Sequence, residues 1–140
     1  MFYSIYSVEK MAFYIQSVHS KKYLDIKDNN DCKGAEVIIF DFTGGKNQQW
    51  KYKNGNIVSE LNGLVLDIER GEESGKIIMW SKNGGDNQKW TFEDDFTIKS
   101  GLNFVLDVKD ASKDNHTNLL AFSGHGGDNQ KFRVVPVNDD

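Results

Sequence analysis

Several features that are common in proteins are missing from this 140-residue chain. Its only cysteine, Cys32, cannot build an internal disulfide framework and fits a reducing compartment. The formal net charge is -4, and the basic residues are mixed with acidic ones, which argues against a nucleic-acid partner. No apolar run approaches the length of a membrane span, so we expect no membrane insertion.

Signals for secretion and for long helices are also missing. The first residues, MFYSIYSVEK, have no basic region followed by an apolar stretch and do not read as a secretory signal. We therefore expect a soluble protein that is cytoplasmic or released without a visible signal peptide. No segment combines a sustained apolar period of 3.6 residues with capping residues, so we predict no long helix.

One short phrase occurs three times in the chain. It reads GGKNQQW from residue 44, GGDNQKW from residue 84 and GGDNQKF from residue 126. A hydrophobic-Asp-hydrophobic phrase precedes each copy: YLDI at 23–26, VLDI at 65–68 and VLDV at 105–108. The chain is therefore one unit of about forty residues written three times, and we expect its chemistry to be present three times too.

Each unit predicts four short β-strands bounded by Gly, Asn, Asp and Lys. The predicted strands are Phe13–Val18, Tyr23–Ile26, Glu36–Phe40 and Gln48–Tyr52; Asn56–Glu60, Leu64–Ile68, Lys76–Trp80 and Gln88–Phe92; and Phe96–Ser100, Phe104–Val108, Asn118–Phe122 and Gln130–Val135. Twelve strands in one small domain favour a closed sheet, because open edges promote aggregation. Trp50, Trp90 and Phe132 occupy equivalent places and are predicted to lie in a shared core.

The threefold Gln-x-Trp/Phe phrase, with an Asp strand before each copy, resembles the ricin-B-type lectins. This resemblance extends from Ala12 to about Val137 and implies an all-β fold, the β-trefoil, with twelve strands in three pseudo-symmetric repeats. The repeats would span about 12–53, 54–94 and 95–137, after an N-terminal extension (1–11) and before a short tail (138–140). The third motif departs from the family pattern in having Phe132 instead of Trp.

An Asp in the middle of each apolar phrase needs a reason, because a carboxylate lowers strand propensity. Asp25, Asp67 and Asp107 can each accept two hydrogen bonds from neighbouring sugar hydroxyls. The alternative is a solvated Asp that starts a turn, or one that is bonded to nearby backbone amides. Three such residues in register favour sugar contact.

An aromatic residue lies at a fixed distance before each Asn-Gln pair. Phe40, Trp80 and Phe122 can stack on the apolar face of a sugar ring, or they can be ordinary core residues. The connection from Asp67 to Trp80 is two residues shorter than in the other repeats, so the sequence specifies the geometry of this pair least.

The resemblance assigns the remaining roles. An Asn amide offers both a donor and an acceptor to a sugar hydroxyl, and the neighbouring Gln would hold the Asp in place. The histidines do not recur between repeats and are expected in surface loops. No catalytic constellation, metal site or cofactor site is predicted. The candidate carbohydrate-binding residues are Asp25, Phe40, Asn47 and Gln48; Asp67, Trp80, Asn87 and Gln88; and Asp107, Phe122, Asn129 and Gln130.

The sequence thus predicts a non-enzymatic lectin for terminal galactose or N-acetylgalactosamine, on glycoproteins or glycolipids, at up to three sites. The alternative function is a β-trefoil scaffold for protein interaction or inhibition that binds no sugar. Acid is expected to weaken sugar binding near the ordinary carboxyl pKa of about 4. Monomer and homodimer both remain open.

Overall fold

The computed structural model describes residues 11–138 and consists of β-strands joined by turns. Within these residues the strands are β1 (Phe13–Ser17), β2 (Tyr23–Ile26), β3 (Val37–Phe40), β4 (Trp50–Lys53), β5 (Asn56–Ser59), β6 (Val65–Ile68), β7 (Ile77–Trp80), β8 (Trp90–Phe92), β9 (Ile98–Ser100), β10 (Val105–Val108), β11 (Thr117–Phe122) and β12 (Phe132–Pro136). The predicted all-β class, with twelve short strands in three repeats, is confirmed.

Short 3₁₀ turns recur at two places in every repeat. After the Asp strand come η1 (Lys27–Asn29), η3 (Glu69–Gly71) and η5 (Lys109–Ala111); before the last strand come η2 (Lys46–Gln48), η4 (Asp86–Gln88) and η6 (Asp128–Gln130). No helix in the described part of the chain is long and apolar enough to cross a membrane.

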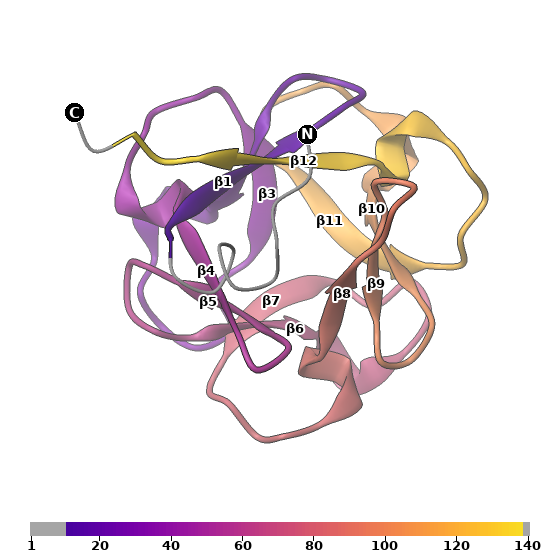
Figure 1. Ribbon diagram of the computed structural model, residues 1–140, viewed down its shortest axis with the longest axis horizontal. Coiled ribbons are helices and arrows are strands. Elements are labelled where there is room, and N and C mark those ends of the chain that lie inside the picture. Colours follow the sequence, from indigo (N-terminus) through magenta and orange to yellow (C-terminus); the bar gives the residue numbers. More distant parts are fainter. Residues whose placement is uncertain (1–10, 139–140) are drawn as a thin grey trace.

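The strands close on themselves in a ring. β1 pairs along its length with β12, from Phe13↔Pro136 to Ser17↔Phe132, so the two ends of the described chain are joined. The pairs β1–β4, β4–β5 and β8–β9 continue the ring. Single backbone bonds, from Trp90 N to Gly55 O and from Phe132 N to Phe96 O, link these pairs to one another and to β12. Figure 1 shows the three repeats, coloured from indigo through magenta to yellow, arranged as three lobes around a common centre.

Three hairpins, β2–β3, β6–β7 and β10–β11, lie outside this ring and meet one another. β11 pairs with β3, and the bridges Glu36↔Ile78 and Lys76↔Leu120 link the hairpins in a cycle. At the meeting point Lys76 Nζ donates to Glu36 Oε2 at 3.2 Å, and Asn118 Nδ2 donates to Glu36 Oε1 at 3.0 Å. Glu36, Lys76 and Asn118 occupy equivalent positions in the three repeats, and the two donors satisfy the carboxylate of Glu36.

The repeated apolar phrases build one core. Leu24, Leu66 and Leu106 are fully buried, and Trp50, Trp90 and Phe132 are only 0%, 2% and 3% exposed. The prediction that these three aromatics lie in the core is confirmed. Large buried aromatic surface of this kind contributes strongly to the stability of a small domain.

Some predicted strands begin too early. The last strand of each repeat starts at Trp50, Trp90 or Phe132, two residues after the predicted start at Gln48, Gln88 or Gln130. These glutamines lie in 3₁₀ turns because their side chains are bonded inside the protein, as described below. Phe96 has a φ of 73° and lies in a turn, so its strand begins at Ile98. Of the predicted extension 1–11, residues 1–10 lie outside the described residues.

Candidate functional site

The three aspartates lie in the middle of β2, β6 and β10, and all three are nearly inaccessible to solvent. Asp25, Asp67 and Asp107 are 4%, 4% and 6% exposed, between apolar neighbours that pack into the core. A buried carboxylate must have hydrogen-bond partners. The alternative of a solvated Asp that starts a turn is therefore wrong for these residues.

The partner of each Asp is the Gln of the repeated phrase. Nε2 of Gln48, Gln88 and Gln130 donates to an Asp Oδ2 atom at 2.9, 2.8 and 2.8 Å, respectively. The same Nε2 also donates to the backbone oxygen of the residue after the stacking aromatic, which is Asp41, Ser81 or Ser123. The Gln Oε1 accepts the backbone N–H two residues further along, from Thr43, Asn83 or His125. Each Gln therefore joins the Asp strand to the loop that follows the aromatic.

The Asn of the phrase lies on the other side of the carboxylate. Nδ2 of Asn47 and Asn129 donates to Oδ1 of the Asp at 3.2 and 3.3 Å, and to the backbone oxygen of the next residue. Asn87 makes the corresponding backbone bond, to Ile68 O at 3.2 Å. A carboxylate has about four acceptor positions, so the one or two bonds from the protein leave room for two from a ligand.

The aromatic rings are on the surface and not in the core. Trp80 is 41% exposed and Phe122 is 37% exposed, while Phe40 is partly buried. The alternative reading as core residues is therefore wrong for Trp80 and Phe122. Trp80 and Asp67 line one hollow of about 270 Å³, together with Asn83 and Arg70. The shorter connection in repeat two thus still brings its Asp and its aromatic ring to a common hollow.

Burial changes the acidity of the three carboxyl groups. It raises the pKa of Asp25 to about 6, even though the Gln48 bond, the charge of His116 and the Asn47 bond act in the opposite direction. Burial also raises the pKa of Asp67 and Asp107. The expectation that acid acts near pH 4 is therefore wrong for Asp25, where protonation begins at a higher pH.

Two histidines adjoin the sites, which the sequence analysis missed. The ring of His116 packs edge-on against Phe40 with centroids 5.1 Å apart. His125 Nδ1 accepts the N–H of Gly127, and its Nε2 lies 3.6 Å from Asp107 Oδ2. A comparison of the residues three positions after each aromatic would have found His125. No local pattern points to His116, because it reaches Phe40 from another repeat.

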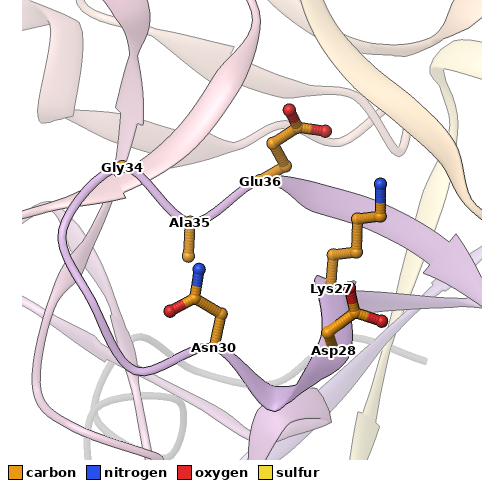
Figure 2. A pocket seen from close by; sticks show the side chains of 6 residues that line it. All are labelled: Lys27, Asp28, Asn30, Gly34, Ala35 and Glu36. Atoms are coloured by element: carbon orange, nitrogen blue, oxygen red, sulfur yellow. The ribbon is translucent and has the colours of Figure 1, made fainter.

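A second hollow, of about 520 Å³, lies inside the loop between β2 and β3. Figure 2 shows the chain from Lys27 to Glu36 curving around it, with Asn30 directed toward Ala35 across the opening. None of the residues that line it is aromatic, so it lacks the flat apolar wall found at the Trp80 hollow. Among residues 11–138 there is also no cluster of three or more metal-ligating side chains.

Comparison with known proteins agrees with this arrangement. The profile of the ricin-type beta-trefoil lectin domain matches residues 11–132. The chain therefore belongs to this family of carbohydrate-binding domains. No curated protein sequence gives a significant match.

Solved structures superpose closely on nearly the whole chain. The designed three-fold symmetric protein ThreeFoil is 33% identical, with a TM-score of 0.82 over 90% of this chain and 99% of its own. The C-half of the earthworm R-type lectin, solved in complex with GalNAc, is 29% identical with a TM-score of 0.82, over 91% and 99%. An exo-beta-1,3-galactanase from Clostridium thermocellum is 28% identical with a TM-score of 0.83, over 91% of this chain but 30% of its own. A similar domain is thus also found as part of a larger enzyme.

Proposed function

We propose that the chain is a lectin with three sites for terminal galactose or N-acetylgalactosamine, carried on glycoproteins or glycolipids. The observation that supports this most is the threefold occurrence of a buried Asp, bonded to Gln and placed beside an aromatic ring. The GalNAc complex of the earthworm lectin, a relative over nearly its whole length, supports the choice of sugar.

Each group has a separate task in the proposed complex. The ionised Asp accepts hydrogen bonds from two neighbouring hydroxyls, and each such bond to a charged acceptor contributes about 1.5–3 kcal/mol. Phe40, Trp80 or Phe122 stacks against the apolar face of the sugar. The Oδ1 of the Asn, which accepts no hydrogen bond from the described residues, receives a third hydroxyl. The Gln holds the carboxylate and does not touch the sugar.

Three such sites on one rigid domain allow several glycans on a surface to be bound together. Single-sugar sites of this size are shallow, so most of the useful affinity would come from this multivalency. The proposed activity needs no catalytic residue, and it is compatible with a role as the targeting part of a toxin or hydrolase complex.

Calorimetric titration with lactose and with N-acetylgalactosamine tests the proposal. We expect saturable binding near three sugars per chain. The variants Asp25→Ala, Asp67→Ala and Asp107→Ala should each remove about one site, while Asp94→Ala, which changes an exposed carboxylate outside the sites, should keep all three. A folded protein that binds neither sugar would refute the proposal and favour the protein-interaction scaffold.

A further inference from the structure

A loop of a neighbouring repeat lies against each of the three sites. In every case a backbone N–H of that loop donates to the carbonyl oxygen of the residue directly before the stacking aromatic. The three bonds are Gly34 N to Met79 O at 2.7 Å, Ser74 N to Ala121 O at 2.7 Å, and His116 N to Ile39 O at 3.0 Å. Since this bond repeats, the residue just before each donor is brought to the same place beside an aromatic ring.

That residue is different at each site, and so is its charge. At the Trp80 site it is Lys33, whose Nζ lies 5.9 Å from the centroid of the Trp80 ring. At the Phe122 site it is Glu73, whose Oε2 accepts a hydrogen bond from Ser123 Oγ at 2.6 Å. Both Lys33 and Glu73 are exposed, so the charge of each is open to a ligand.

At the Phe40 site the equivalent residue is the neutral Asn115. Its Oδ1 accepts the N–H of Asp41 at 3.0 Å, and its Nδ2 donates to Asp41 Oδ2 at 2.9 Å. Lys22 Nζ lies 3.8 Å from the other oxygen of this carboxylate and balances its charge. The edge of this site is therefore close to neutral.

The other charges around the sites leave this difference in place. The hollow at Trp80 is also lined by one acidic and one basic side chain, Glu69 and Arg70, so Lys33 adds a positive charge to a lining that, apart from Asp67, has one charge of each sign. At the Phe122 site the nearby His125 and, more weakly, Asp110 act on Asp107 with opposite signs, and Glu73 adds a negative charge. At the Phe40 site His116 and Asp28 likewise act on Asp25 with opposite signs. The edges are thus positive at Trp80, negative at Phe122 and balanced at Phe40.

We propose that residues 33, 73 and 115 determine how each site responds to charge on the glycan. The Trp80 site favours galactosides that carry a sulfate or carboxylate group near the galactose, the Phe122 site disfavours them, and the Phe40 site does not discriminate. This inference rests on the proposed galactose binding. One exposed charge pair changes affinity by about two- to fivefold, and salt screens the effect.

The test compares lactose with 3′-sulfated and 6′-sulfated lactose in NMR titrations of the ¹⁵N-labelled protein. The backbone amides of Thr43, Asn83 and His125 report separately on the three sites, because each donates to the Gln of its site. The measured quantity is the Kd for lactose divided by the Kd for the sulfated sugar. For at least one sulfate position we expect a ratio of about two to five at Asn83, the inverse at His125, and about one at Thr43.

Charge variants at the two exposed positions provide the control. Lys33→Glu should reverse the ratio at Asn83, and Glu73→Lys should reverse it at His125. Lys33→Gln and Glu73→Gln should bring each ratio to about one, and Glu73→Gln keeps an acceptor for Ser123. Each variant should leave the ratios at the other two sites as in the wild type, and 0.5 M NaCl should bring the ratios closer to one.

The outcomes separate the two proposals. Lactose shifts at the three amides, with ratios that are equal at all sites or unchanged by the variants, would overturn the charge assignment and leave galactose binding in place. No shift with lactose at any of the three amides would overturn both.

Discussion

The Trp80 site and the two Phe sites share one set of bonded polar groups but differ in nearly everything around it. Both Phe sites have a histidine nearby, His116 at Phe40 and His125 at Phe122, whereas the Trp80 hollow is lined by charged side chains. The connection to Trp80 is also shorter. The shared Asp and Gln side chains are buried and depend on one another, so a change in one leaves the other without a partner. The exposed residues carry no such constraint, which is why the sites differ there.

The strand that carries the Asp is also held differently. Trp90 Nε1 donates to Leu66 O at 3.1 Å, directly beside Asp67, so the indole ties β6 to the core. The equivalent Trp50 Nε1 is buried and has no hydrogen-bond partner in residues 11–138, and Phe132 has no such group. Only the Asp strand of the Trp80 site is held in this way.

Removing a shared buried group should have the largest effect. Gln88→Ala deletes the bonds to Asp67, to Ser81 O and from Asn83 N. We expect the free energy of unfolding in urea to fall by about 2–4 kcal/mol, because a buried carboxylate and two backbone groups lose their partners. Lactose binding at the Trp80 site should be lost as well.

The matched control is Gln16→Ala. The Gln16 amide makes one hydrogen bond, to the exposed backbone oxygen of Lys21. We therefore expect the free energy of unfolding to fall by less than about 1 kcal/mol. An equal fall in unfolding free energy for the two variants would show that the buried hydrogen bonds of Gln88 add little to stability. The presence of the same Asp and Gln at all three sites would then need another explanation.

Lowering the pH should separate the Phe40 site from its equivalents. With a pKa of about 6 for Asp25, affinity for lactose at this site should fall about tenfold between pH 7 and pH 5, if binding requires the ionised form. The charge of His116 lowers this pKa, so His116→Phe should move the loss to higher pH. Site-resolved NMR titrations with lactose at several pH values would measure this loss of affinity. Unchanged affinity at pH 5 would contradict the role of an ionised Asp25.

The same shift has the opposite consequence for the unliganded fold. The pKa of Asp25 is higher in the folded protein than its ordinary value of 3.8, so its contribution to stability is fully present below about pH 4 and is lost as the pH rises through about 6. Relative to Asp25→Asn, the wild type should therefore gain roughly 1–2 kcal/mol between pH 7 and pH 4 in urea unfolding.

A comparison of the two buried tryptophans tests the anchoring of the Asp strand. Both Trp50→Phe and Trp90→Phe remove similar volume from the core, but only the second breaks a hydrogen bond. We expect Trp90→Phe to cost about 1 kcal/mol more in thermal or urea unfolding. Equal costs would mean that the indole bond to Leu66 does not matter for holding β6.

The sequence was sufficient for the architecture because the repeated phrases carry both the strand pattern and the turn residues. Leu24, Leu66 and Leu106 mark the buried strands, and Gly44 marks a turn that requires its φ of 75°. The predicted strand starts at Gln48 and its equivalents were wrong, because a buried amide side chain that is bonded to the backbone overrides local strand propensity.

The candidate sites were predictable only where their parts lie within one repeat. Asp25 and Gln48 belong to the same repeat, and the family resemblance carried by the repeated phrase implied their pairing. Lys33 and His116 adjoin aromatic rings of other repeats, and their places depend on how the hairpins meet. A single sequence has no local feature that encodes such contacts. The raised pKa of Asp25 also follows from burial, which the alternation of a strand alone did not indicate.

The smallest expected effect concerns the ring itself. Trp80→Phe makes the Trp80 site more like its equivalents, and Phe122→Trp makes the Phe122 site more like the Trp80 site. A Trp presents a larger face to a sugar, so we expect the first change to weaken lactose binding at its site by about twofold and the second to strengthen it similarly. Because Trp80 and Phe122 are both largely exposed, neither change should alter the free energy of unfolding by more than about 0.5 kcal/mol. Site-resolved titration of both variants with lactose decides whether ring size affects affinity. If lactose affinity is unchanged in both variants, ring size does not determine affinity at these two sites.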